Sequence, residues 1–194
     1  MMERNNMGVN GMEKGIEQGK NGGKKWDEII IRVLVLLLTL VAAILIGVNK
    51  QTKIVAITIS PDLPAFNVPV TAKSSYVSAF VYFVVANSIA CVFTAVTLVA
   101  TFARKGGRTS LLLFTTMLID VMMVALLFSC VGAAGAVGVL GAKGNSHLRW
   151  NKVCDVYTKY CHQVEAAIAL SFFAAVAYVL LLLLEVSKLQ RSRY

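Results

Sequence analysis

The sequence predicts an all-α fold, a four-helix transmembrane bundle with both termini in the cytoplasm. The chain of 194 residues is 57% hydrophobic and only 15% charged, whereas soluble domains average roughly 45 to 50% apolar and about 25% charged residues. Four stretches also supply the ~20 mostly apolar residues that one bilayer crossing needs. These predicted spans cover residues 29–48, 77–102, 111–140 and 166–184.

The segment before the first span is expected to be a disordered cytoplasmic head. Residues 1–28 carry six glycines and several asparagines, without an apolar periodicity that could bury one face of a helix. No small-residue cleavage site follows the first span, which predicts a retained signal anchor. The predicted organisation is therefore a head over residues 1–28, a four-span membrane domain over 29–186 and a cytoplasmic tail over 187–194.

The distribution of Lys and Arg predicts the orientation in the membrane, because cytoplasmic loops are enriched in these residues. Placing both termini in the cytoplasm puts eleven cations on that side and seven on the other. Three of the eleven, Arg104, Lys105 and Arg108, crowd one short inner turn. The cations lie on both sides without a basic stripe interleaved with aromatics, so the net charge of +9 indicates attraction to anionic membrane lipid and no nucleic acid partner.

The first outer loop, residues 49–76, is not expected to be a continuous helix. It contains all three prolines of the chain, Pro61, Pro64 and Pro69, and proline breaks a helix interior. The segment 53–59 is rich in β-branched residues, which favours a short strand.

The outer half of the third span carries a stripe of small residues. Glycines recur there among alanines, at Gly132, Gly135, Gly138 and Gly141. Small residues let helix backbones approach closely in lipid, so the stripe predicts a tight helix contact. The alternative, a pore lining, has no accompanying segment that resembles a selectivity filter.

Two opposite charges, Arg32 and Asp120, lie inside the first and third spans. Placing a charge in the hydrocarbon of the membrane costs several kcal/mol unless a partner of opposite charge compensates it. Counted from the cytoplasmic side, the two backbones differ in depth by roughly 8 to 9 Å at 1.5 Å per residue, a distance that arginine can reach. The sequence therefore predicts an intramembrane charge pair, either within one subunit or between two. If Arg32→Asp combined with Asp120→Arg restores the assembly that either single change removes, the pair has a structural role.

Other readings of the charged residues remain open. Arg32 can also extend to the inner membrane interface, whereas Asp120 is too deep and too short to do so, and an intramembrane acid can serve a proton or ion pathway. Glu165 and Glu185 bracket the fourth span, and we expect both to be solvated at the membrane interfaces.

The four cysteines divide into two kinds. Cys91 and Cys130 lie within spans and read as small buried thiols. Cys154 and Cys161 lie in the second outer loop, on the side where disulfides are favoured. In an unbroken helix their Cα atoms would be about 10 Å apart, beyond disulfide reach, so a bond between them requires a break in the helix.

No pattern in the sequence predicts catalysis, a cofactor or a metal site. Cys154, Cys161 and His162 lack a fourth ligand at a recognised zinc spacing. A nucleophile with a base, a phosphate-binding glycine loop and paired catalytic carboxylates are all missing from the sequence. We therefore expect a protein that is not an enzyme.

The second outer loop, residues 144–163 with the sequence GNSHLRWNKVCDVYTKYCHQ, resembles the plant Casparian strip membrane domain protein-like family, and group 1 in particular. Trp150, Cys154 and Cys161 match the tryptophan and the paired cysteines of that family's loop. The resemblance extends over the whole chain after the head, since Arg32 and Asp120 match the family's arginine in span one and aspartate in span three.

The resemblance implies a multi-pass plasma-membrane protein, related to the MARVEL four-span proteins, that forms homo-oligomers and hetero-oligomers with related four-span proteins. The founding Casparian strip proteins form membrane platforms that guide local cell-wall modification. The first outer loop of this chain, through residues 65–69, departs from the characteristic loop of those founders.

From these observations we expect a non-enzymatic scaffold whose spans assemble laterally and whose loops recruit partners. The alternative is a small transporter or channel subunit that uses Asp120 as a protonatable site. The two hypotheses differ in whether Asp120→Asn abolishes an ion-dependent flux while assembly is preserved.

Overall fold

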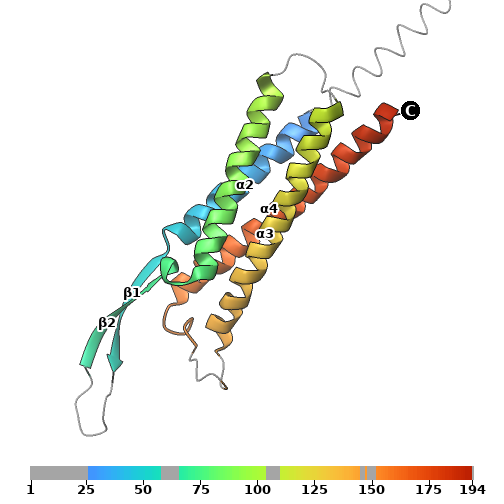
Figure 1. Ribbon diagram of the computed structural model, residues 1–194. Helices are drawn as coiled ribbons and strands as arrows, with labels where there is room; N and C mark the ends of the chain where they lie inside the picture. The colour runs from blue at the N-terminus through green and yellow to red at the C-terminus, as the bar shows by residue number, and fades with distance from the viewer. Residues whose placement is uncertain (1–25, 58–65, 104–109, 145–146, 148–151, 194) are drawn as a thin grey trace, which may run out of the picture.

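The computed structural model describes residues 26–57, 66–103, 110–144, 147 and 152–193. Four helices in it are long and apolar enough to cross a membrane, and Figure 1 shows them packed side by side. The predicted four-helix transmembrane bundle is therefore confirmed. In chain order the described elements are the first helix Trp26–Gly47, β1 Lys50–Ile57, β2 Phe66–Lys73, the short 3₁₀ helix η1 Ser74–Tyr76, α2 Ser78–Ala103, α3 Ser110–Lys143 and α4 Thr158–Arg193.

Three of the four described helices are longer than the predicted spans, most of all the last one, whereas α2 has the predicted length. α4 covers Thr158–Arg193, whereas the apolar run predicted only 166–184. Hydropathy marks the part of a helix that lies in hydrocarbon, and the backbone hydrogen bonds continue into polar residues at both ends. Most of the predicted head, the inner turn at 104–108 and Trp150 lie outside the described residues.

A two-stranded antiparallel hairpin joins the first helix to α2 and projects from one end of the bundle (Figure 1). Its register runs from Lys50 opposite Lys73 to Ile57 opposite Phe66, so β1 covers the described part of the segment that favoured a strand. Pro69 lies in β2 without breaking it, because both strands are edges and a proline costs an edge strand no ladder bond on its open side.

The base of the hairpin is attached to the start of α4, which matters because an isolated hairpin is only marginally stable. The backbone N–H of Tyr160 donates to Oε1 of Gln51 at 2.9 Å, and the hydroxyl of Tyr157 donates to the carbonyl of Val70 at 3.0 Å. The side-chain amide of Asn49 donates to the carbonyl of Tyr160 at 3.1 Å. These bonds fix the hairpin end of the bundle.

The buried positions of the helices repeat at alternating spacings of three and four residues. On the first helix they include residues 28, 32, 35, 39, 42 and 46, and on α4 they include residues 164, 167, 171, 174, 178, 181 and 185. This 3.5-residue period is the seam of left-handed helix packing. Large apolar side chains on the outward faces, such as Leu37, Val96 and Met122, are exposed, as expected where the surrounding medium is lipid.

The small residues that line this seam are mainly alanines. Buried alanines lie on all four helices, at Ala42, Ala43, Ala86, Ala90, Ala134, Ala167, Ala174, Ala175 and Ala177. The glycine stripe of α3 is placed differently, because a Cβ added at Gly132 or Gly135 would meet no described atom within 4 Å, and one at Gly138 or Gly141 would make an ordinary contact at 3.8 or 3.9 Å. Among the described residues, a Cβ could therefore be added at each of these four glycines, and their role in helix packing stays a prediction.

Candidate functional site

Arg32 is the centre of a buried charge cluster that joins all four helices. Its Nη2 donates to Oδ2 of Asp120 on α3 at 2.8 Å and to Oε1 of Glu185 on α4 at 2.9 Å. Its Nη1 donates to the hydroxyl of Thr97 on α2 at 3.1 Å. Nε lies 3.5 Å from Oε1 of Glu28, one turn earlier on the first helix.

The cluster is shielded from its surroundings by the bundle itself. The side chain of Arg32 is fully buried, and those of Glu28, Asp120 and Glu185 are at most 3% exposed. Moving an ion out of water costs several kcal/mol, and good geometry with several hydrogen bonds is needed to offset this cost. The planar guanidinium meets this requirement because its five N–H groups serve several acceptors at once. Removing one member would leave the others buried without that compensation.

The structure therefore places Arg32 and Asp120 in direct contact within one chain. The sequence predicted only one of the three acids of the cluster. Glu28 was assigned to the predicted disordered head, but it lies in the first helix and is buried. Glu185 was expected to be solvated at a membrane interface, but it is buried against Arg32, whereas Glu165 is exposed as expected. The reason is that α4 continues well past the apolar run, so Glu185 still lies on the inward seam, four residues after Leu181.

A second polar layer lies next to the charge cluster in the bundle interior. The hydroxyls of Thr94 on α2 and Tyr178 on α4 share a hydrogen bond, and Tyr178 also lies within bonding distance of the carbonyl of Ala90. Both side chains are at most 1% exposed. The layer ties α2 to α4 at one level of the membrane.

A third polar layer lies farther toward the hairpin end. The hydroxyl of Ser171 on α4 donates to Oδ1 of Asn87 on α2 at 2.9 Å, and the amide nitrogen of Asn87 donates to the carbonyl of Phe83 at 2.9 Å. Cys130 on α3 contacts the same amide nitrogen at 3.7 Å through its sulfur. The sequence signal for this layer was the presence of polar residues at seam positions within apolar spans. Hydropathy alone does not distinguish these positions from other polar positions in a span.

The hairpin end of the bundle carries a disulfide between Cys154 and Cys161, with Cα atoms 5.6 Å apart. Cys154 precedes the first residue of α4, Thr158, so the helix break that such a bond requires is present. The N–H groups of Val153 and Cys154 donate to the carbonyl of Gly141 near the end of α3, at 2.9 and 3.2 Å. The disulfide loop thus closes over the ends of two helices.

These features describe a bundle whose interior polar groups bond to one another between helices. Among the described residues, no group of three or more His, Cys, Asp or Glu side chains is arranged to hold a metal ion. What the cluster can do chemically is to set the relative position of four membrane helices with one ion network.

Comparison with known proteins gives the chain its relatives. The family model described as the Casparian strip membrane protein domain matches residues 21–177. CASP-like protein 1E1 of Arabidopsis thaliana is 49% identical over 183 residues, which cover 93% of this chain and 95% of the relative. CASP-like protein 1E2 of Vitis vinifera is 50% identical over 177 residues, 90% of each chain. CASP-like protein 1E1 of Ricinus communis is 44% identical over 195 residues, 99% of each chain. No solved structure matches the chain significantly.

Proposed function

The chain belongs to the Casparian strip membrane protein domain family, and from this premise we propose that it is a non-enzymatic plasma-membrane scaffold. In this proposal it assembles laterally with copies of itself and with related four-span proteins, and its loops organise a membrane domain that supports local cell-wall modification. The observation that carries the proposal is the Arg32 cluster, which ties one residue to all four helices.

The cluster favours a scaffold with a rigid helix arrangement over a transporter or channel. A transport site needs an acid that can exchange its proton or ion with water on alternating sides. Asp120 instead lies beside the guanidinium of Arg32, and the next polar layer toward the hairpin is closed by the bond between Thr94 and Tyr178. Two layers of this kind hold the helices in one arrangement, which is what a lateral building block requires.

The surface of the bundle is compatible with lateral assembly. Helix association in lipid depends on close backbone approach at small residues. Gly132 on α3 is exposed, and a side chain there would meet no described atom within 4 Å. Another helix can therefore approach the α3 backbone at this position, which gives Gly132 a role between chains.

The orientation in the proposal places the hairpin end outside the cell and both termini in the cytoplasm. Disulfides persist on the oxidising, non-cytoplasmic side of a membrane, and the bond between Cys154 and Cys161 lies at the hairpin end. The crowded cations at 104–108 belong to the opposite side of the predicted topology. The projecting hairpin would then face the wall, where it is available to partners (Figure 1).

Chemical cross-linking in native plant membranes tests the scaffold proposal. We expect short cross-links to recover copies of the chain and related four-span proteins, identified by mass spectrometry. Gly132→Leu should reduce these products. Ala166→Leu, at an exposed position on α4 instead of α3, serves as the matched control. Recovery of the chain as a monomer under all conditions would overturn the proposal.

Flux measurements in reconstituted vesicles separate the scaffold from the transporter alternative. A scaffold should give no proton- or ion-dependent flux above that of empty vesicles, for the wild-type chain and for Asp120→Asn alike. A flux in the wild-type chain that Asp120→Asn abolishes, with the cross-linked products unchanged, would establish the alternative.

A further inference from the structure

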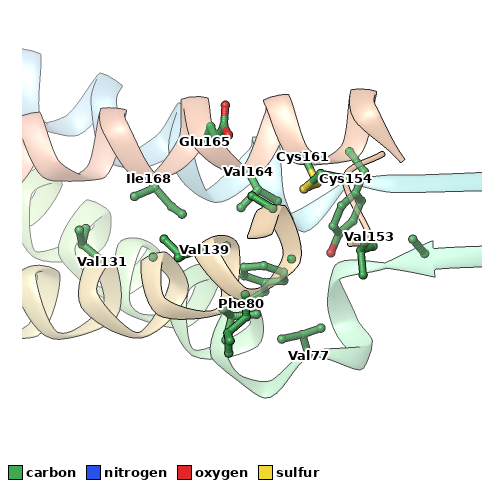
Figure 2. A pocket seen from close by; sticks show the side chains of 18 of the residues that line it. Val77, Phe80, Val131, Val139, Val153, Cys154, Cys161, Val164, Glu165 and Ile168 are labelled. Atoms are coloured by element: carbon green, nitrogen blue, oxygen red, sulfur yellow. A yellow bond between two sulfur atoms is a disulfide. The ribbon is translucent and has the colours of Figure 1, made fainter. Parts of the chain in front are cut away.

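An apolar groove opens between α2, α3 and α4 at the hairpin end of the bundle. Its volume is about 630 Å³, within the ~300–1,000 Å³ range of ligand sites, which are mostly apolar with a few placed polar groups. Figure 2 shows apolar side chains from the three helices around it, among them Phe80, Val139, Val164 and Ile168. Gly135 and Gly138 on α3 also line it, and their lack of side chains keeps it open.

The groove has a cationic end. Lys73, the last residue of β2, is among the residues that line it. Lys50, the first residue of β1, is directly opposite Lys73 in the strand register, so their Cβ atoms are about 5 Å apart and their side chains leave the same face of the hairpin. Both lysines are exposed.

This pair of lysines is unfavourable on its own, because like charges directly opposite each other destabilise a strand pair. An anion placed between the two ammonium groups removes that repulsion. The pair also lies at the level where the chain leaves the membrane, since the first helix ends at Gly47 and α2 begins at Ser78. Phosphate headgroups of lipids are found at this level.

The remaining charged residue at the groove does not oppose an anion there. Glu165 is counted among the lining residues, but its carboxylate points away from the apolar side chains in Figure 2. It lies 3.7 Å from Nδ1 of His162, and both side chains are about 70% exposed (74% and 69%). The polar character of the groove mouth is therefore set by the lysines.

We propose that this groove binds one anionic phospholipid, with an acyl chain along α3 and the phosphate group between Lys50 and Lys73. The groove is too small for a helix of a second copy, because two turns of a helix about 10 Å wide displace about 850 Å³. Cys154, in the loop before α4, and Cys161, in the first turn of α4, also line it, so a helix could not run past that end. A single acyl chain is narrow enough to fit and matches the apolar walls.

Native mass spectrometry of the detergent-purified full chain tests the proposal with two probes. The probes are palmitoyl-oleoyl phosphatidylglycerol and the phosphatidylcholine with the same chains, offered at equal concentration. The wild-type chain should retain one phosphatidylglycerol in preference to phosphatidylcholine. Lys50→Gln and Lys73→Gln should each lower phosphatidylglycerol retention about fivefold, the usual contribution of one lysine at an anionic membrane surface.

Two matched controls make the test specific. Lys53→Gln removes a lysine that is also exposed but leaves the other face of β1, outside the groove lining, and should leave retention unchanged. Gly135→Leu adds a side chain to the groove lining, at a position where a Cβ would meet no described atom within 4 Å, and should abolish retention of both lipids. Gly132→Leu adds the same side chain outside the lining and should not.

Three results would overturn the proposal. Equal losses from Lys53→Gln and Lys73→Gln would reduce the effect to general surface charge. Unchanged retention in Gly135→Leu, with a melting temperature equal to that of the wild-type chain, would place the lipid elsewhere. A change of oligomeric state in Gly135→Leu without a change in lipid retention would assign the groove to a second copy of the chain.

Discussion

Nη2 of Arg32 lies 2.8 Å from Oδ2 of Asp120, although 88 residues separate the two in the chain. The same nitrogen lies 2.9 Å from Oε1 of Glu185, so one side-chain atom of the first helix bonds to both α3 and α4. Both acids therefore depend on the exact place of a single donor group, and the cluster responds to a change in geometry as well as to a change in charge.

Replacing Arg32 should cost more than replacing any acid of the cluster. Arg32→Gln would leave three carboxylates close together in the bundle, and breaking a buried ion pair from one side costs roughly 3 to 5 kcal/mol. Arg32→Lys keeps the charge but loses the fork that reaches two acids and Thr97, so an intermediate loss is expected. The measurement is the free energy of unfolding in mixed detergent micelles. A loss below about 1 kcal/mol for Arg32→Gln would show that the cluster contributes little to stability.

Exchanging the charges of Arg32 and Asp120 should not restore the bundle. The exchange would put a carboxylate at position 32 beside Glu28 and Glu185, which are now in contact with the guanidinium. Like charges at this separation destabilise a buried site. We therefore expect the double variant Arg32→Asp with Asp120→Arg to stay as unstable as Arg32→Asp alone, by thermal melting in detergent. Recovery to within about 1 kcal/mol of the wild-type chain would mean that Glu28 and Glu185 are not part of the network.

The four spans and the contact between Arg32 and Asp120 were accessible from the sequence because each has a local signal. Twenty apolar residues define a crossing, and the rise per residue gives the depth of each charge. The helix break that a bond between Cys154 and Cys161 requires likewise follows from the seven-residue spacing and the reach of a disulfide. Each of these predictions depends only on a distance along one helix, which the residue spacing gives directly.

To predict the burial of Glu185 and the polar layers at Thr94 and Asn87, one must know which face of each helix points inward. Hydropathy does not give this rotational phase when all faces of a helix are apolar. The phase is present in the polar residues themselves. Glu28, Arg32 and Thr39 share one seam on the first helix, and Ser171 and Glu185 share one on α4. A search for polar residues spaced by three and four within apolar spans would have found both seams. The hairpin register depends on contacts between distant segments, and in the described strands only residues 53–57 of β1 had a local signal.

The third polar layer predicts a modest and specific loss of stability. Ser171→Ala removes the hydroxyl that donates to Oδ1 of Asn87, and hydrogen bonds between membrane helices contribute about 0.6 kcal/mol on average and up to about 1.7. The free energy of unfolding in detergent should fall by an amount in that range. Ser88→Ala is the matched control, since Ser88 is exposed and donates to the carbonyl of Val84 in its own helix. Equal losses in the two variants would contradict a role for the bond between helices.

The disulfide at the hairpin end predicts a stability that depends on reductant. The bond between Cys154 and Cys161 closes a loop with a sequence separation of 7, and the chain-entropy relation gives about 2.5 kcal/mol for a loop of that size. Reduction, or the double variant Cys154→Ser with Cys161→Ser, should therefore lower the melting temperature of the purified chain. Cys91→Ala is the control, because Cys91 is a free thiol and its removal should leave the response to reductant intact.

The dependence on reductant can be separated from a general effect on the protein. In the double serine variant the covalent loop is already absent, so the melting temperature should be the same with and without reductant. The two hydrogen bonds from Val153 and Cys154 to the carbonyl of Gly141 remain available in both cases, which limits the loss to the loop and the start of α4. A further fall on adding reductant to the double variant would show that the stabilising bond is not the one between Cys154 and Cys161.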